Sequence, residues 1–341
     1  MTSLKKIAQQ ANVSVATVSN VLNNRGRVGV KTKNKILQIA EDLNYSPNRL
    51  AKSLKMNKSQ TIGVIVEDLS VFNAPEIIDG INSFAEDHGY SILLMNLRMK
   101  KKTGMQYPET EICKQEVAPF FRVLLASQVE GVIYIGIHNR DVKGVLPESS
   151  IPIVYTYCDT SNPQDLSVNY DDFQASYNAT EYLLNNGHKD IGVITGFNDS
   201  ESTIERLRGF KQALRDHGLN WNDEWQKEGD WTYNSGYSQT KELFNRSRAP
   251  KAIFTMNDLM AGGAFKAAVE LKLKIPDDIA IIGFDNQEIS QYLLPTLTTM
   301  NLPLNEIGKQ SIDLLIKKIN GENIRINKIK LNCTLIRRES V

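Results

Sequence analysis

The order of apolar and polar residues changes near residue 60. From Thr61 onward, short β-branched runs alternate with longer stretches in which apolar residues recur every three or four positions. The short runs predict strands at 61–66, 91–96, 131–135, 152–155, 190–195, 251–255 and 278–284. The longer stretches predict helices at 75–88, 111–127, 171–186, 202–217, 233–246, 259–272 and 304–319. We expect parallel sheets flanked by helices, and about 280 residues exceed one ordinary core, so we expect two lobes.

The first 60 residues show only helical spacing. Their apolar positions predict helices at 4–11, 15–23 and 32–43, and Ser3 and Ser14 are placed to cap the first two. Only three residues separate these two helices, which is the pattern of a helix-turn-helix. In that motif the second helix enters the major groove of DNA. Its outward-facing residues would be Val15, Ala16, Ser19, Asn20 and Asn23.

The charge of the chain is strongly segregated. Residues 1–60 hold eleven Lys or Arg and two acidic residues, whereas the remainder holds 29 basic and 37 acidic residues. A small basic head on an acidic body is typical of a head that binds a polyanion. The alternative is an ordinary three-helix domain with a solvated basic face, and the polar outer face of the second helix argues against it.

Two segments of the head carry a resemblance to a known family. The run IAQQANVSVATVSNVLNN at 7–24 and the run YSPNRLAKSL at 45–54 resemble the signature and the hinge of the lactose/galactose repressor family of bacterial transcription regulators. The resemblance continues through the body and covers nearly the whole chain. It implies a small all-α helix-turn-helix DNA-binding domain at 1–46, a hinge helix and linker at 47–60, and a two-lobed α/β periplasmic-binding-protein-like domain at 61–341.

The resemblance also implies how the body is divided. Its chain would cross between the lobes three times, and we place these crossings near 160, 290 and 322. The N-lobe would then hold about 61–160 and 291–321, and the C-lobe about 161–290 and 322–341. This body would bind the effector and form a homodimer.

In the family, two heads of a dimer read the two half-sites of a near-palindromic operator. Phosphate contacts would come from Ser14, Thr17, Ser19, Asn23, Thr32 and Asn48. Base contacts would come from Val15, Ala16 and Asn20. The family pattern VSR has arginine where Asn20 stands. Because Arg pairs best with guanine and Asn with adenine, we expect a changed half-site, unless Asn20 reaches only phosphate.

The hinge, from Asn48 to Lys55, is too short to form a stable helix alone. We expect it to become helical on the operator, with Arg49 and nearby lysines toward phosphate and Ala51 on the same face as Leu54. By resemblance, Leu54 would be the apolar wedge in the minor groove. An ordinary linker helix that packs on the body is the alternative.

The effector should lie beyond the carboxyl ends of the strands, as ligands of open α/β sheets do. From such positions and the family resemblance, we expect contacts from Phe72, Thr156, Ser202, Arg206, Trp231, Asn257 and Asp285. Asp258 is equally suited to cap a helix. Trp231 alone would suit a core, but its context EGDW resembles the family and favours a platform for a sugar. Thr156 stands where the lactose repressor pattern has an acid, so a simple galactoside does not follow.

Sequence motifs of catalysis are missing. The chain has no nucleotide-binding loop, nucleophile elbow, zinc-protease motif or calcium loop. None of its four histidines has a Cys or His neighbour at metal-ligand spacing. We therefore expect no enzymatic activity, no cofactor and no metal. The N-terminal residues lack an apolar signal stretch, no run of about 18 apolar residues occurs, and the three cysteines lie far apart, so we expect a cytoplasmic location without membrane contact.

These observations lead to one main hypothesis of function. The chain would be a sequence-specific DNA-binding repressor of a carbohydrate-utilisation operon, and a small sugar between the lobes would control its operator affinity. The alternative is control by a non-sugar corepressor or a phosphorylated carrier protein. A pure solute-binding protein with the same body is disfavoured by the basic head. The segment 97–115 is about ten residues longer than the family connection and would form a surface loop or a lip over the cleft.

Overall fold

The structure, a computed structural model, describes residues 4–22, 26–43, 45, 58–103, 110–245 and 248–341. It divides into two compact units, Met1–Gln60 and Thr61–Val341. Each unit has its own hydrophobic core, so each is treated by itself.

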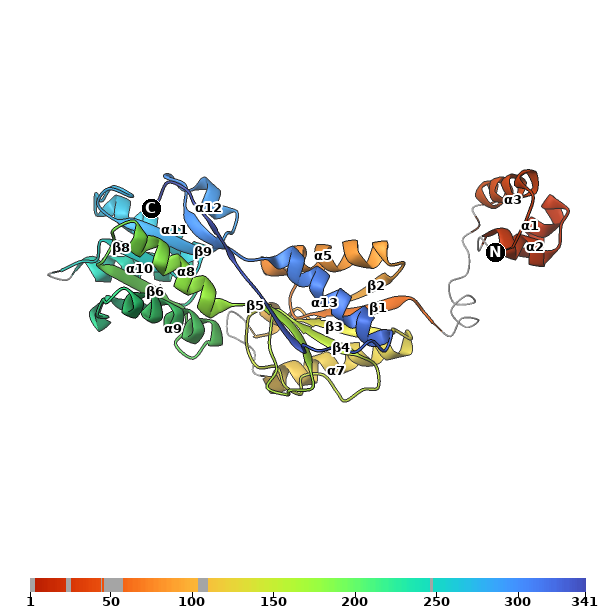
Figure 1. The fold of residues 1–341 in the computed structure, drawn as a ribbon, viewed down its shortest axis with the longest axis horizontal. Helices are drawn as coiled ribbons and strands as arrows, with labels where there is room; N and C mark the ends of the chain where they lie inside the picture. Colours follow the sequence, from red (N-terminus) through yellow and green to blue (C-terminus); the bar gives the residue numbers. More distant parts are fainter. Residues whose placement is uncertain (1–3, 23–25, 44, 46–57, 104–109, 246–247) are drawn as a thin grey trace. The chain divides into compact units, whose positions relative to one another are not determined.

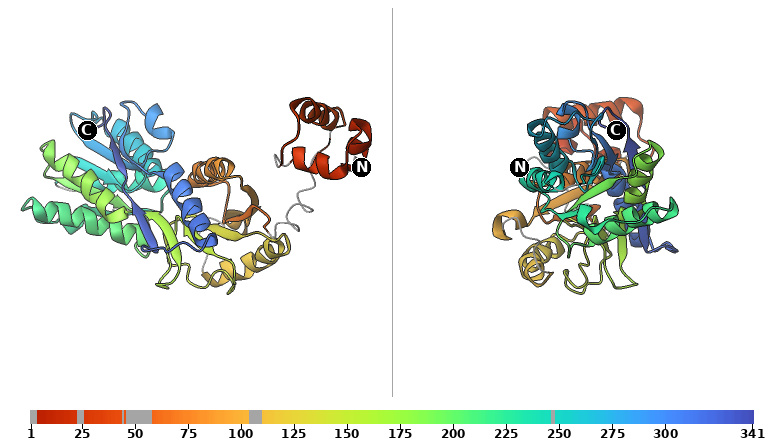
Figure 2. Two further views of the ribbon diagram at one scale, coloured as in Figure 1. Left: turned by 45° about the vertical axis from the view of Figure 1, so that its right-hand side comes forward. Right: turned by 90° about the vertical axis from the view of Figure 1, so that its left-hand side faces the viewer.

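The first unit is a bundle of three short helices: α1 Leu4–Ala11, α2 Val15–Leu22 and α3 Val30–Asp42 (Figure 2). Its core forms where the apolar stripes of the helices meet, at Ile7, Val18 and Ile36, which are fully buried. Lys35 of α3 donates its ammonium to the carbonyl of Ala11 at 3.2 Å, which satisfies the end of α1. The third helix begins two residues earlier than predicted, at Val30.

The N-lobe of the second unit is built on a six-stranded parallel sheet in the order β11-β5-β4-β3-β1-β2 (Figure 1). Helices α5 and α13 cover one face of this sheet, and α7 covers the other. The strands are β1 Thr61–Val66, β2 Ser91–Asn96, β3 Gly131–Ile135, β4 Ile153–Thr156, β5 Leu166–Tyr170 and β11 Lys328–Leu331. The helices are α5 Asn73–Asp87, α6 Met99–Thr103, α7 Thr110–Ala126 and α13 Leu304–Ile319.

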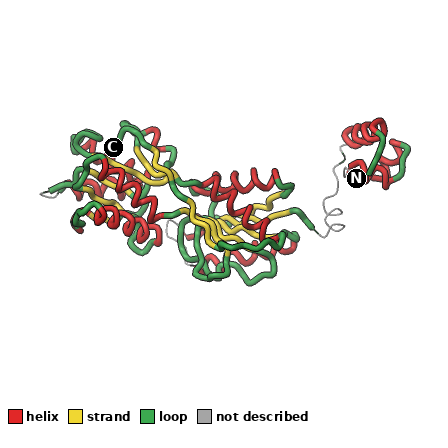
Figure 3. Tube along the Cα trace, viewed as in Figure 1, coloured by secondary structure: helices red, strands yellow, loops and turns green. Residues whose placement is uncertain are grey.

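The C-lobe repeats this architecture, a sheet flanked by helices (Figure 3). Its sheet order is β12-β10-β9-β8-β6-β7, in which only β12 is antiparallel to its neighbour. Its strands are β6 Ile191–Thr195, β7 Gln226–Glu228, β8 Ala252–Thr255, β9 Ala280–Asp285, β10 Thr298–Asn301 and β12 Thr334–Ile336. Its helices are α8 Asp172–Asn185, α9 Glu201–Asp216, the 3-10 helix η1 Asp223–Trp225, α10 Tyr233–Phe244, α11 Asp258–Glu270 and α12 Ile289–Tyr292.

The chain crosses between the lobes about ten residues later than the sequence predicts. β5 and β11 belong to the N-lobe sheet and β10 to the C-lobe sheet, so the crossings follow Tyr170, Asn301 and Leu331. The positions near 160, 290 and 322 were wrong because these three strands lack a continuous apolar run. In β5, for example, Ser167 and Asn169 are polar yet buried.

Helices α5 and α13 lie unusually close together. A Cβ on Gly80 would stand 2.1 Å from the carbonyl oxygen of Asn305, and one on Gly308 would stand 2.1 Å from that of Ile77. Both glycines are therefore required by the approach of the two backbones rather than by a turn. Within the part of the chain that the structure describes, no helix combines the length and apolar character that a membrane span needs.

This contact predicts the effect of a small substitution. Gly308→Ala should lower the free energy of unfolding by about 2 kcal/mol or more, because overpacking outweighs the roughly 1 kcal/mol that alanine gains in a helix. Urea denaturation of the wild type and the variant measures the change. Gln310→Ala on the same helix is the control and should stay within about 0.5 kcal/mol. Unchanged or increased stability of Gly308→Ala would contradict the close approach.

Candidate functional site

A cavity of about 360 Å³ lies between the two lobes, near the lower end of the range usual for small-molecule sites. The N-lobe lines it with Ser70, Val71, Phe72, Asn73, Lys100, Thr103, Ile137, His138, Tyr157 and Tyr170. The C-lobe lines it with Ser202, Arg206, Asp230, Trp231, Asn257, Leu259, Asp285 and Gln287.

The strand order of each sheet explains the position of the cavity. In a doubly wound sheet, ligands bind where the strand order reverses, beyond the carboxyl ends. The reversal lies between β1 and β3 in the N-lobe and between β6 and β8 in the C-lobe. Phe72 and His138 follow β1 and β3, whereas Arg206 and Asn257 follow β6 and β8. The two reversal points therefore contribute to the same cavity.

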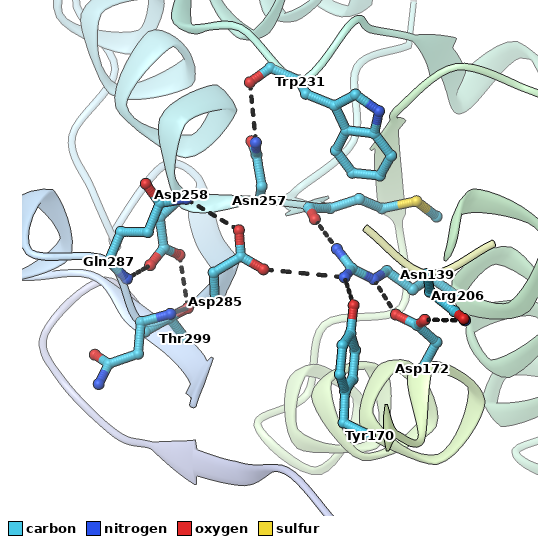
Figure 4. A network of polar contacts seen from close by, with 12 residues as sticks. Asn139, Tyr170, Asp172, Arg206, Trp231, Asn257, Asp258, Asp285, Gln287 and Thr299 are labelled. Carbon is cyan, nitrogen blue, oxygen red and sulfur yellow. Dashed lines mark hydrogen bonds and ion pairs between the residues drawn. The ribbon is translucent and has the colours of Figure 1, made fainter. Parts of the chain in front are cut away.

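Arg206 on α9 is the centre of a buried polar network (Figure 4). Its side chain is 3% exposed. Nε donates to Asp172 Oδ1 at 2.6 Å, Nη2 donates to the Tyr170 hydroxyl at 2.9 Å, and Nη1 donates to the carbonyl of Met256. The guanidinium carbon lies 3.7 Å from the centre of the Phe284 ring. Three of its five N–H groups are thus used within the protein.

The network of Arg206 connects the lobes. Asp172, the first residue of α8, accepts a hydrogen bond from Asn139 Nδ2 at 3.2 Å through its second carboxylate oxygen. Asn139 Oδ1 in turn accepts from Asn169 Nδ2 of β5 at 2.8 Å. Tyr170 also belongs to β5 of the N-lobe. Asp172 and Arg206 of the C-lobe are therefore hydrogen-bonded to the N-lobe at two points, Asn139 and Tyr170.

Asp285 ends β9 and places a carboxylate in the cavity wall, 3.9 Å from Arg206 Nη2. Its backbone has a φ of 103°, a conformation that favours glycine, and such strain is often found at functional sites. Gln287 donates Nε2 to Asp285 Oδ2 at 3.0 Å. Burial raises the pKa of the Asp285 carboxyl to about 7, although Arg206 and the Gln287 hydrogen bond act in the opposite direction.

Asp258 supports the loop that carries Asp285. Its carboxylate accepts from the Thr299 hydroxyl at 2.6 Å and from the backbone N–H of Gln287 at 2.7 Å. A Cβ on Gly283 would stand 2.2 Å from this carboxylate, so glycine leaves room for it. Burial and the Asp285 charge raise the pKa of Asp258 well above its ordinary value. Asp258 is therefore a buried support, and Asn257 caps α11 instead by accepting from the Met260 N–H.

Trp231 forms an aromatic wall of the cavity. Its backbone has a φ of 68°, and its carbonyl accepts from Asn257 Nδ2 at 2.9 Å. The indole rests on Gly196, where a Cβ would stand 1.9 Å from the ring. Its Nε1 is buried without a hydrogen-bond partner among the described residues. Buried indole N–H groups usually have a partner, so this donor suits a bound ligand or water.

Six of the seven predicted effector residues line this one cavity: Phe72, Ser202, Arg206, Trp231, Asn257 and Asp285. Thr156 does not. It is fully buried at the end of β4, and its hydroxyl donates to Ser311 of α13 at 2.9 Å. The next residue, Tyr157, lies just beyond β4, has a positive φ of 59° and lines the cavity. The structure therefore does not bring Thr156 to the cavity.

Several lining residues were not predicted. Tyr157 follows β4 and Tyr170 ends β5, which are strand-end positions like those from which the other effector residues were expected. Lys100 and Thr103 lie on α6, within the segment 97–115 that was expected to be a loop or a lip. The expectation of a lip placed this segment at the cleft, but the sequence did not indicate a helix here or which side chains line the cavity.

The head presents its predicted DNA-reading residues on α2. Val15, Ala16 and Asn20 are exposed, with Val15 at 41%, and Ser19 and Thr17 are half-buried on the same helix. Thr32 is half-buried in the first turn of α3. The remaining predicted DNA contacts lie outside the described residues: Asn23, Asn48, Arg49, Ala51 and Leu54.

Ser14 fixes the start of α2. Its Oγ accepts from the backbone N–H of Thr17 at 3.1 Å and lies 2.9 Å from the Thr17 hydroxyl. This is the arrangement of an N-cap, which sets where the exposed face of the helix begins. Both hydroxyls thus have a partner within the helix.

A helix-turn-helix unit followed by a two-lobed α/β body with an interlobe cavity defines a DNA-binding regulator rather than an enzyme. Residues 3–48 match the family model described as bacterial regulatory proteins, lacI family. Residues 180–341 match the model described as a periplasmic binding protein-like domain.

Relatives extend these matches to the full length. The HTH-type transcriptional repressors PurR of Pasteurella multocida and Photobacterium profundum are 32% and 30% identical over 343 aligned positions, covering 100% of this chain and 99% of each relative. This chain belongs to the lacI family of DNA-binding transcriptional repressors.

Solved structures agree with this assignment. The lac repressor dimer bound to operator and the anti-inducer ONPF is similar with a TM-score of 0.80 and 28% identity, covering 99% of this chain and 98% of that one. The transcriptional regulator CelR–cellobiose complex is similar with a TM-score of 0.69 and 26% identity, covering 100% of both chains.

The position of Asp285 predicts a pH dependence of stability. Its pKa of about 7 in the folded chain lies above the roughly 3.9 of an unfolded aspartate, so its stabilising contribution is full below pH 4 and is lost as the pH rises to 7. Relative to Asp285→Asn, the wild type should lose on the order of 2–4 kcal/mol of unfolding free energy between pH 4 and pH 8. Urea denaturation at several pH values measures this, with the exposed Asp277→Asn as control. A constant difference between wild type and Asp285→Asn would contradict the raised pKa.

Proposed function

We propose that this chain represses a carbohydrate-utilisation operon and that a small sugar bound in the interlobe cavity controls its affinity for the operator. The observation that carries the proposal is the wall formed by Trp231, Asp285 and Asn257. A sugar has an apolar ring face and a rim of hydroxyls, and this wall offers an indole beside a carboxylate and an amide. Asn257 retains one amide N–H beyond its two internal hydrogen bonds.

One solved relative supports this ligand class. The CelR structure is a complex with cellobiose. The alternative remains a non-sugar corepressor or a phosphorylated carrier protein.

For the DNA side, we propose a homodimer that binds a near-palindromic operator in the cytoplasm, as the lac repressor dimer is bound to its operator. The exposed face of α2, with Val15, Ala16 and Asn20, would read bases. Phosphates would be held by Ser14, Thr17, Ser19 and Thr32 and by Asn23 and Asn48. We propose the same DNA-contacting role for Arg49, Ala51 and the wedge Leu54.

The cavity and the operator would be coupled through the lobes. A ligand changes DNA affinity only if it prefers one arrangement of the lobes, and such coupling is typically about 1–3 kcal/mol. The network from Asn139 through Asp172 and Arg206 to Tyr170 supports coupling through the lobes, because its hydrogen bonds join both lobes beside the cavity.

The effector proposal predicts a specific loss. In isothermal titration with a panel of mono- and disaccharides and free nucleobases, the wild type should bind a sugar, and Asp285→Asn should weaken it about ten- to a hundredfold, because a charge-assisted hydrogen bond is lost. Gel shifts without the sugar should show unchanged operator binding. Arg206 is unsuitable for this test, because removing it would leave Asp172 buried and unpaired.

The control is Asp277→Asn, which removes an exposed carboxylate of the same lobe and should leave sugar affinity unchanged. Binding of a nucleobase in place of every sugar would refute the sugar and favour the corepressor alternative. Equal sugar affinity of wild type and Asp285→Asn would show that the carboxylate does not contact the ligand.

The head predicts a change in sequence preference. Asn20 is exposed on α2, so Asn20→Arg should shift one base of the preferred half-site from adenine toward guanine. Selection of binding sites from a random pool, followed by sequencing, measures the preference. Lys31→Gln is the control: Lys31 is an exposed cation in the first turn of α3, and losing its charge should weaken binding to the DNA backbone without changing the preferred site. Identical sites for wild type and Asn20→Arg would exclude base reading by this residue.

A further inference from the structure

The short helix α6, Met99–Thr103, carries three consecutive lysines, and the first of them, Lys100, lines the effector cavity. Lys100 and Thr103 both line the cavity. Residues three apart lie on the same face of a helix, so this face of α6 is directed at the ligand space. Lys102 points elsewhere, because its ammonium pairs with Glu116 of α7.

The backbone of α6 is firmly attached to the N-lobe. The Met99 side chain is fully buried, and its N–H donates to the carbonyl of Glu67 at 2.9 Å. The Lys100 N–H donates to Asp68 Oδ2 at 2.8 Å. The Thr103 hydroxyl donates to the Met99 carbonyl at 2.9 Å. Lys100 is therefore an exposed ammonium on a fixed backbone, and its position relative to the cavity is set by the fold.

A second hollow adjoins the cavity at α6. It is lined by Asp68, Leu69, Ser70, Asn96, Arg98, Lys100 and Lys101, and it shares Ser70 and Lys100 with the effector cavity. Within the described chain, the side chains of Arg98, Lys100 and Lys101 make no ion pair closer than 4 Å. A group that extends from the cavity past Ser70 and Lys100 would therefore meet three cationic side chains.

One carboxylate, that of Asp68, stands among these cations. It is buried, and it already accepts from the Ser70 N–H at 2.9 Å, the Ser70 hydroxyl at 2.7 Å and the Lys100 N–H. Its charge offsets one of the three cations, so a positive excess remains. In the cavity itself, Arg206 is the other cation, and it is held by Asp172 and Asp285. Of the two Lys or Arg side chains that line the cavity, Lys100 is thus the one that is available to bind a ligand.

We infer that the effector is an anionic sugar, a hexose that carries a phosphate or a carboxylate, whose charged group lies between Ser70 and Lys100 while its ring lies against Trp231. This inference rests on the proposed function, because it refines the ligand of the same cavity. It assigns Lys100 as a specificity-determining residue. Arg98 and Lys101 contribute longer-range attraction from the adjoining hollow.

The exposure of Lys100 limits the size of the effect. Exposed ion pairs are weak and screened by salt, whereas charge-assisted hydrogen bonds at a partly enclosed site are stronger. At low salt, we expect the charged sugar to bind about tenfold more tightly than its neutral counterpart. In Lys100→Gln, this ratio of affinities should fall by a factor of about three to ten.

The experiment is isothermal titration of the full chain with matched ligands: hexoses, their 1- and 6-phosphates, the corresponding hexuronates and inorganic phosphate alone. Wild type, Lys100→Gln and Lys102→Gln are compared at two salt concentrations. Lys102→Gln is the matched control, because it removes a cation of the same helix that faces Glu116. The preference for the charged sugar should fall with salt and with Lys100→Gln, and it should persist in Lys102→Gln. Comparison of the phosphates with the hexuronates identifies the anion.

The outcomes separate this inference from the proposed function. Equal affinity for neutral and charged hexoses, or a preference that survives Lys100→Gln, overturns the anionic site and leaves the sugar-binding proposal in place. Binding of inorganic phosphate that depends on Lys100, without binding of any hexose, overturns the sugar and keeps the anion site. Absence of binding by every probe overturns both.

Discussion

The burial of the Arg206 guanidinium is the constraint on which the cavity and the joining of the lobes depend. A buried charge is tolerated only when it is paired and hydrogen-bonded. Here the partners come from α8, β5 and the end of β8, and Phe284 of β9 covers one face. These elements must therefore keep their positions for Arg206 to remain charged inside the protein. The same requirement fixes the wall on which Asp285 stands, because Asp285 lies 3.9 Å from the same guanidinium.

This constraint also explains how a small ligand could act on the whole body. Asp172 follows the first crossing between the lobes by a single residue, and Tyr170 precedes it. Arg206 binds both, so the cavity wall and the crossing share one hydrogen-bond network. A packed network of this kind has few alternative arrangements, and a ligand that favours one of them shifts the lobes together rather than one residue at a time.

Most of the fold could be predicted from the sequence, because its apolar runs and helical stripes are continuous. The strands missed were those interrupted by polar residues, such as β5 with its buried Ser167 and Asn169 and β11 with its exposed lysines, and their loss moved the expected crossings. In the site, strand ends and resemblance indicated six lining residues. Thr156 instead contacts Ser311, and Tyr157 lines the cavity through a positive φ of 59° that the sequence pattern does not indicate. Lys100 was beyond prediction, because α6 is fixed by Asp68 and the backbone of Glu67, which are distant in sequence.

The cavity therefore combines two kinds of residue with different physical roles. Arg206, Asp172, Asp258 and Gly283 hold the wall together through buried contacts, and a ligand of any chemistry would need them in place. Phe72 and Lys100 line the cavity with exposed side chains that take no part in that network, so substitutions there should change the lining at little cost to the fold. The C-lobe supplies the rigid carboxylate and aromatic wall against which different ligands can be held.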